Sequence, residues 1–127
     1  MKSGATKPRT YMCSVTGFNY EGRADYILRH IQAGSSLQLI REPSNRYDRQ
    51  AVAVYHNNHK IGYIPRRKGW VSASLDEGDE HDVKVFEVDV DEGDILGIYI
   101  QITIARDGPR RPPSFLTRLW RWLNQRQ

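Results

Sequence analysis

The chain has 127 residues, of which 39% are hydrophobic and 27% are charged, and its formal net charge is +4. This length predicts one domain with its own core and room for short arms. No apolar run is long enough to span a bilayer, no secretion signal is present near the start, and the single Cys13 excludes an internal disulfide. We therefore expect an intracellular protein without integral membrane association, located in the cytoplasm or, in a bacterium, at the nucleoid.

The N-terminal third predicts an arm, a strand and a helix. Residues 1–9 are basic and polar, which predicts a flexible arm, and residues 10–16 alternate as a first strand. The sequence GFNYEG at 17–22 then breaks this strand. Apolar side chains recur at helical spacing over residues 23–33 and predict an amphipathic helix that covers one end of a barrel. These side chains are Ala24, Ile27, Leu28 and Ile31.

The middle of the chain predicts a mainly β domain over residues 10–106. Asparagines at 57 and 58 separate two β-rich runs, which is typical of a hairpin because asparagine tolerates positive φ. A short helix is predicted over residues 66–75. Six short strands with two helices favour a small barrel or sandwich. The strands are predicted at residues 10–16, 36–41, 51–55, 60–64, 83–90 and 95–104, and in the last of them the isoleucines at 98, 100, 102 and 104 alternate and share one face.

Charge is distributed unevenly along the chain. Residues 41–68 carry seven basic and two acidic side chains, whereas ten carboxylates and only Lys84 lie between Asp76 and Asp94. If these segments lie on different faces, one face attracts phosphate and the other repels it. The alternative interpretation is that both segments are ordinary solvated surface.

The turn at residues 45–49 is the strongest candidate for a binding site. Asn45, Tyr47 and Asp48 stand there between Arg46 and Arg49. A tyrosine stacks on any base, arginines bind phosphates, and a carboxylate accepts a hydrogen bond from a hydroxyl group but repels a phosphodiester. This mixture predicts a site for a nucleic-acid end. The alternative is structural, since Asp48 can also cap its own turn by accepting backbone N–H bonds.

No catalytic, metal or cofactor site is predicted. Of the four histidines, at 30, 56, 59 and 81, His56 and His59 lie at a predicted hairpin tip and have no cysteine or carboxylate at ligand spacing, and we interpret all four as surface residues. The chain lacks a P-loop and a nucleophile elbow, and Cys13 has no histidine partner in view. We therefore expect a protein that is not an enzyme.

The end of the chain, residues 107–127, predicts a linker rich in proline and arginine followed by an amphipathic helix. Its apolar residues could pack on the barrel, dock to a protein partner or a second copy, or lie on a membrane or nucleic-acid surface. The predicted partner-binding residues of this tail are Phe115, Leu119, Trp120, Trp122 and Leu123.

Four sequence blocks between Val15 and Asp91 together resemble the HIRAN domain, which occurs in DNA-remodelling helicases and as small free-standing bacterial proteins. The blocks are VTGFNY at 15–20, LQLIREP at 37–43, NRYDRQAV at 45–52 and IGYIP at 61–65. They follow the family order and spacing over about two-thirds of the chain. The resemblance implies a small OB-like or SH3-like β-barrel that binds single-stranded DNA and, in fork-remodelling members, captures a free 3′ end.

The resemblance also implies roles for individual residues. Tyr20 and Tyr47 would flank the terminal bases, and Asp48 would accept a hydrogen bond from the 3′-hydroxyl group. Asn45 would shape the loop, and Arg66 would contact a phosphate. The complete set of predicted DNA-binding residues is Asn19, Tyr20, Arg41, Asn45, Arg46, Tyr47, Asp48, Arg49, Tyr63, Arg66, Arg67 and Lys68.

At three positions the chain differs from family members. Tyr63 stands where some members have histidine, Asn19 stands where the fork-remodelling form has a basic residue, and Glu21 replaces an aromatic residue and places negative charge near the pocket. The function implied is a non-enzymatic module that binds single-stranded DNA or DNA 3′ ends in repair or replication-fork processing. The alternative function is a protein-interaction adaptor or oligomerisation module that acts through the C-terminal helix.

Overall fold

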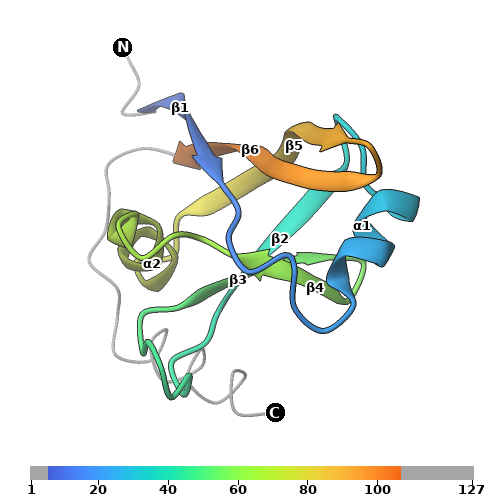
Figure 1. Cartoon of the computed structure of the whole chain (residues 1–127). Helices are drawn as coiled ribbons and strands as arrows, with labels where there is room; N and C mark the ends of the chain where they lie inside the picture. The colour runs from blue at the N-terminus through green and yellow to red at the C-terminus, as the bar shows by residue number, and fades with distance from the viewer. Residues whose placement is uncertain (1–5, 107–127) are drawn as a thin grey trace.

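The structure is a computed structural model that describes residues 6–106. These residues form six strands, which make up one curled antiparallel sheet, and two helices that pack beside it (Figure 1). The strand order is β1-β6-β5-β2-β3-β4. This half-barrel confirms the predicted mainly β, OB-like fold class. The elements are β1 (Thr6–Ser14), α1 (Arg23–His30), β2 (Ser36–Arg41), β3 (Val52–His56), β4 (His59–Tyr63), α2 (Gly69–Asp76), β5 (Glu80–Asp91) and β6 (Asp94–Arg106).

The two ends of the curled sheet meet through one β-bridge. Thr16, just after β1, pairs with Tyr63 at the end of β4, and each backbone N–H donates to the carbonyl oxygen of the other residue over 2.8 Å. A Cβ atom at Gly62 would collide with the Thr16 carbonyl oxygen. Glycine at this position therefore allows the two backbones to approach closely enough to bond.

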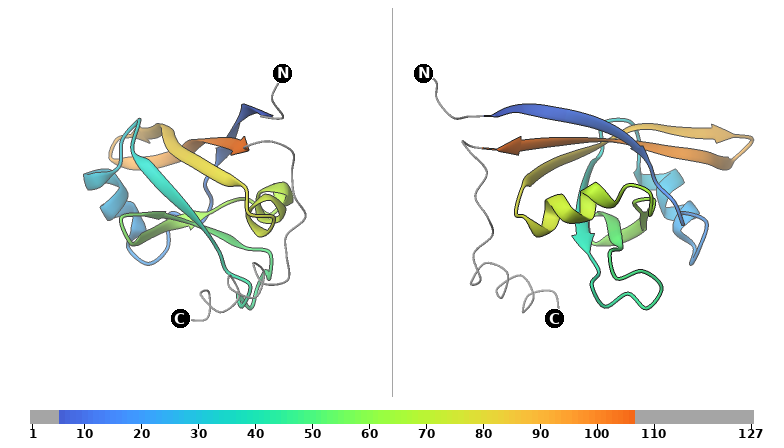
Figure 2. Two further views of the ribbon diagram at one scale, coloured as in Figure 1. Left: turned by 180° about the vertical axis from the view of Figure 1, so that it is seen from behind. Right: turned by 90° about the vertical axis from the view of Figure 1, so that its left-hand side faces the viewer.

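The core lies on the concave side of the sheet. Ile98, Ile100 and Ile102 on β6 are completely buried, which confirms the alternation predicted for this strand. On β5 a bulge between Val85 and Glu87 shifts the alternation, so that Val83 and Val85 before it and Val88 after it face the core. The two helices lie beside the sheet, as the views in Figure 2 show, and each contributes buried residues to the same core.

Both helices differ from their predicted bounds. α1 ends at His30 instead of residue 33, because Ile31 adopts an extended conformation and buries its side chain in the core. Leu28, predicted on the buried face of α1, is exposed, so the helix buries a narrower stripe than expected. α2 begins at Gly69, since the preceding residues form a turn in which the Lys68 N–H donates to the Pro65 carbonyl oxygen.

The predicted arm of residues 1–9 is too long. β1 begins at Thr6, because β6 continues to Arg106 and supplies backbone partners for the earlier residues. The predicted tail helix within residues 107–127 lies outside the described residues. Neither α1 nor α2, the helices among residues 6–106, has the length and the apolar composition of a membrane-spanning segment.

Substituting Gly62 tests the bridge that closes the half-barrel. Gly62→Ala should lower the free energy of unfolding by about 1–3 kcal/mol, because the added methyl group forces the paired strands apart. Gly69→Ala is the matched control, since the nearest atom to its added Cβ would be Gln50 Oε1 at 4.0 Å. Urea denaturation followed by tryptophan fluorescence measures both variants. Equal stability of the two variants would contradict the role of the bridge.

Two of the described histidines are half-buried rather than on the surface. Nδ1 of His56 forms a 2.7 Å hydrogen bond with the hydroxyl group of Tyr26. The ring of Tyr26 also stacks on the ring of His59. Burial, followed by the positive charges of His30 and His59, lowers the pKa of His56 below its usual 6.5. Burial also lowers the pKa of His81, although Asp79 opposes the effect. The folded state thus disfavours the protonated form of both side chains.

This difference predicts that stability falls in mild acid. Because both histidines have a lower pKa in the folded state, the unfolded state binds more protons once the pH falls below about 6.5. We expect the melting temperature to drop between about pH 7.5 and about pH 5.5. A His56→Asn, His81→Asn double variant should show a smaller drop over the same range by differential scanning fluorimetry. An identical drop in the double variant would assign the effect to other groups.

Candidate nucleic-acid interface

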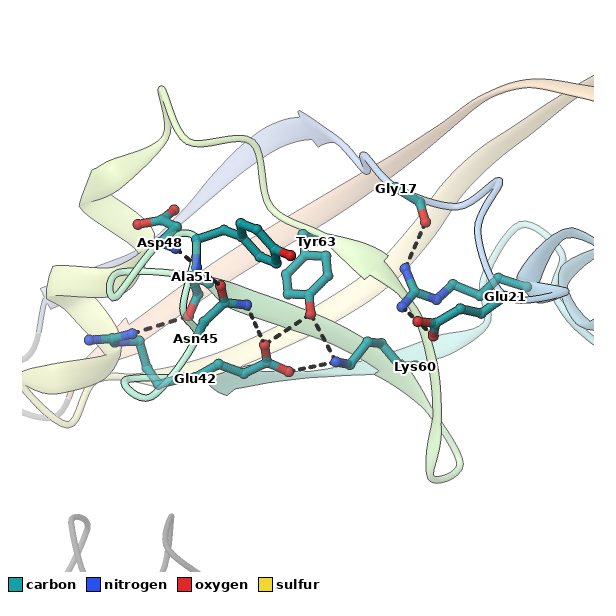
Figure 3. Close-up of polar contacts among 11 residues, drawn as sticks. Gly17, Glu21, Glu42, Asn45, Asp48, Ala51, Lys60 and Tyr63 are labelled. Atoms are coloured by element: carbon teal, nitrogen blue, oxygen red, sulfur yellow. Dashed lines mark hydrogen bonds and ion pairs between the residues drawn. The ribbon is translucent and has the colours of Figure 1, made fainter.

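A groove opens where the sheet closes on itself, between the loop after β1 and the loop that joins β2 to β3. Its volume is about 870 Å³. Figure 3 shows the two loops on either side of Tyr63, with Asp48 on one side and Glu21 on the other. The lining residues are Thr16, Tyr20, Glu21, Arg23, Asn45, Tyr47, Asp48, Ala51, Tyr63, Ile64 and Arg66.

Asn45 organises the loop that carries the candidate residues. Its Oδ1 accepts hydrogen bonds from the backbone N–H groups of Tyr47 (2.9 Å) and Asp48 (3.0 Å). Its Nδ2 donates to Glu42 Oε1 over 3.0 Å. An asparagine makes this arrangement because it offers an acceptor and a donor on one short side chain. The loop is thereby tied to Glu42, the residue that directly follows β2, and held in a tight turn.

Asp48 uses its two oxygen atoms differently. Oδ1 accepts a 3.0 Å hydrogen bond from the N–H of Gln50, which confirms the turn-capping interpretation for this atom. Oδ2 lies 3.4 Å from Nε of the exposed Arg66. Arg66 also donates through Nη2 to the Tyr47 carbonyl oxygen over 2.7 Å. The second oxygen is therefore held beside a cation at the groove rather than used inside the turn.

Two tyrosines at the groove are unusually exposed. Tyr47 has 81% of its surface accessible and Tyr20 has 68%, so neither packs in the core. The Arg46 guanidinium lies 5.8 Å from the centre of the Tyr47 ring. Both exposed rings are suited to stacking on bases, and at Tyr47 a cation is also close enough to meet a neighbouring phosphate.

A partly buried network supports the groove floor at Tyr63 (Figure 3). The Tyr63 hydroxyl group donates to Glu42 Oε1 over 2.9 Å, and Lys60 Nζ lies 2.9 Å from that hydroxyl oxygen and 2.7 Å from Glu42 Oε2. Burial acts to raise the pKa of Glu42, but hydrogen bonds from Lys60, Asn45 and Tyr63 outweigh it and lower this pKa. For Lys60 burial is likewise outweighed, and its two partners raise the pKa to about 12. The pair stays ionised and fixes the ring.

The HIRAN domain family matches residues 9–104. The chain belongs to this family. The HIRAN domain of human HLTF has a similar fold, with a TM-score of 0.61 and 15% identity over 91% of this chain and 88% of that chain. A crystal structure of a protein from Lactobacillus plantarum has a TM-score of 0.60 and 22% identity over 77% of this chain and 99% of that one. A comparison with curated proteins found no significant match.

Family membership carries a general functional conclusion. The HIRAN domain is a DNA-binding module and a binding domain rather than a catalytic one, which supports nucleic-acid binding in general for this chain. The two solved structures, at these identities, show the fold. Among the described residues, no group of three histidine, cysteine or acidic side chains is placed to hold a metal ion.

The HIRAN fold brings half of the predicted residues together. Six of the twelve line the groove, namely Tyr20, Asn45, Tyr47, Asp48, Tyr63 and Arg66. Four others are outside the lining but on the exposed surface, namely Asn19, Arg46, Arg49 and Arg67, and Lys68 lines a smaller cavity next to Asp48 and Arg66.

Arg41 has a different position from the other predicted arginines. Its guanidinium donates to the carbonyl oxygens of Arg49 and Ala51 and pairs with Asp76 on α2 over 3.0 Å. These contacts clamp the loop onto α2 and occupy the donors that a phosphate would need. We therefore assign Arg41 a structural role in holding the loop.

The groove also contains residues that sequence reasoning missed. Thr16 is one partner of the bridge that closes the sheet, Ile64 directly follows the other partner, and Ala51 directly precedes β3, and nothing in their local sequence marks them. Arg23 was predicted only as the start of a helix, yet its guanidinium lies 5.8 Å from the centre of the Tyr63 ring. A cation placed directly after the GFNYEG loop was the available signal for Arg23.

Asn45 should be required for the order of the loop. Asn45→Ala removes two hydrogen bonds to the loop backbone and one to Glu42, and should destabilise the fold by about 0.5–2 kcal/mol, as loss of a capping side chain does. Hydrogen exchange at the Tyr47 and Asp48 amides should become faster. Asn19→Ala, on the exposed loop after β1, is the control. Unchanged exchange at both amides would show that the turn holds without this side chain.

Proposed function

We propose that this HIRAN domain binds single-stranded DNA without catalysing a reaction, prefers strands that end in a free 3′-hydroxyl group, and serves DNA repair or replication-fork processing. The observation that supports this most directly is the position of Asp48, which lines the groove together with the exposed Tyr47 and Arg66 and whose Oδ2 lies 3.4 Å from Arg66 Nε. A hydroxyl acceptor, a phosphate cation and a stacking ring thus occupy one site.

The carboxylate supplies the end preference. An ionised Asp48 only accepts hydrogen bonds, so a terminal 3′-hydroxyl group can donate to it, while a 3′-phosphate or a continuing phosphodiester is repelled. Because Oδ1 already caps the turn, Oδ2 keeps a defined direction. Arg66, at 3.4 Å, is close enough to offset the charge of the carboxylate and to bind the preceding phosphate.

The remaining affinity comes from stacking and from charge. Tyr47 and Tyr20 each offer a ring face, and base stacking on such rings contributes about 1–3 kcal/mol per base with little sequence preference. Arg46, Arg49 and Arg67 lie on the exposed surface and would meet phosphates further along the strand. Their contribution should fall as salt rises, because binding releases counterions from the strand.

Asp48→Asn tests the end preference. Asparagine retains an oxygen that can cap the Gln50 amide. It removes the negative charge, which repels a 3′-phosphate and strengthens the hydrogen bond from a 3′-hydroxyl group. We expect wild-type protein to bind a 3′-hydroxyl strand about tenfold or more tightly than the same strand with a 3′-phosphate, since a hydrogen bond to a charged group contributes about 1.5–3 kcal/mol. The variant should lose most of this ratio. Fluorescence anisotropy with 5′-labelled strands measures both.

Two further variants complete this experiment. Tyr47→Ala should weaken binding of both strands alike, because stacking does not depend on the end group. Asp82→Asn removes one exposed carboxylate from β5 and should leave the ratio unchanged, which controls for net charge. Equal binding of the two strands by the wild-type protein would refute the proposed preference for 3′-hydroxyl ends.

A further inference from the structure

Glu21 and Arg23 form an ion pair inside the groove. Arg23 Nη2 donates to Glu21 Oε2 over 3.0 Å, and Arg23 Nη1 donates to the Gly17 carbonyl oxygen over 2.8 Å. The two side chains differ in exposure, because Arg23 has 9% of its side-chain surface accessible and Glu21 has 77%. The arginine is therefore fixed from below, while the glutamate covers it from the solvent side.

The backbone at Glu21 is unfavourable for a glutamate. Its φ is +58°, and the next residue, Gly22, has φ +71°. A left-handed conformation favours glycine, so the backbone itself does not require a side chain at position 21. What the glutamate side chain adds is its contact with Arg23. An ion pair with one exposed partner contributes little in water, so a competing anion can displace the carboxylate easily.

The pair lies where a bound strand would continue from the Asp48 end of the groove. Figure 3 shows Asp48 and Glu21 on opposite sides of Tyr63. Arg23 lies 5.8 Å from the centre of the Tyr63 ring, and both Arg23 and Glu21 line the groove. A strand that places its terminal nucleotide at Asp48 and crosses Tyr63 brings a backbone phosphate toward Arg23.

We propose that Glu21 is a built-in competitor for a phosphate site on Arg23, and that a phosphate of the bound strand displaces its carboxylate. This inference rests on the proposed binding of single-stranded DNA and adds the position of a second phosphate site. A phosphate is a suitable replacement, because arginine binds phosphate and carboxylate oxygens with the same donors. Glu21 thereby lowers affinity for every strand and excludes strands that bind too weakly to displace it.

Glu21→Gln tests this directly. Glutamine retains the size of the side chain but removes the charge that holds Arg23. With a 5′-labelled single strand of about ten nucleotides that ends in a 3′-hydroxyl group, we expect about fivefold tighter binding at low salt. The slope of log affinity against log salt should stay close to that of the wild type, because Arg23 meets a phosphate in both complexes and only the cost of displacing the carboxylate is removed.

Glu92→Gln is a closely matched control. Glu92 is also exposed and also has a left-handed backbone, with φ +52°, but it lies in the turn between β5 and β6, outside the groove lining. Its substitution changes the net charge by the same amount. We expect binding by Glu92→Gln to match the wild type in both affinity and salt slope.

A double-mutant cycle separates release of Arg23 from simple removal of a negative charge. In an Arg23→Gln background, Glu21→Gln should give no gain in affinity, because the site that the glutamate occupies is gone. An equal gain in both backgrounds would overturn the proposal, as would equal gains from Glu21→Gln and Glu92→Gln.

The outcomes also separate this inference from the proposed end preference. A gain specific to Glu21→Gln, seen with 3′-hydroxyl and 3′-phosphate strands alike and without a wild-type preference between them, supports the Arg23 site and refutes the role of Asp48. If the wild type prefers 3′-hydroxyl strands but Glu21→Gln gives no specific gain, the role of Asp48 is supported and the Arg23 site is refuted. If neither wild type nor Glu21→Gln binds the strand, both are refuted.

Discussion

The paired hydrogen bonds between Thr16 and Tyr63 are the contact on which the groove depends. They join the end of β1 to the end of β4 and turn a curled sheet into a half-barrel. The loop at residues 17–22 follows directly from one partner, and Tyr63 is the other. Closing the sheet therefore creates the groove in the same step, and Gly62 is the residue whose missing side chain permits it.

The groove is lined by carboxylates, although the proposed ligand is a polyanion that carboxylates repel. Each of these carboxylates is paired with a cation, which reduces the repulsion. Glu42 is paired with Lys60 in a partly buried network that also fixes Tyr63, and breaking such a pair leaves an uncompensated charge. Asp48 and Glu21 instead belong to ion pairs with one well-exposed partner, which is Arg66 with 75% and Glu21 itself with 77% of its side-chain surface accessible. Such pairs contribute little to stability and exchange partners readily. The exposure of one partner thus distinguishes the pairs that a ligand can reorganise from the structural pair of Glu42 and Lys60.

Sequence patterns predicted the elements well where the signal is local. The isoleucines of β6 alternate as expected, and Asn57 and Asn58 adopt the positive φ angles predicted for the hairpin turn. The roles of individual residues were predicted less well where they depend on contacts between residues far apart in the sequence. Arg41 belongs to the same basic segment as Arg66, yet it binds the loop backbone and Asp76, because the fold brings α2 beside the loop. Charge along the chain does not reveal which cation already has a partner.

The sequence by itself determined the family, the mainly β architecture and the residues of the turn from Asn45 to Asp48, because these follow from periodicity, turn chemistry and motifs read within short segments. Only the tertiary structure decided that Arg23 shares the groove with Asp48 and pairs there with Glu21, and that Arg41 lies outside the groove lining. The physical reason is that the groove is formed by a backbone pairing between residues 16 and 63, and such non-local contacts leave no signal in the segments that they join.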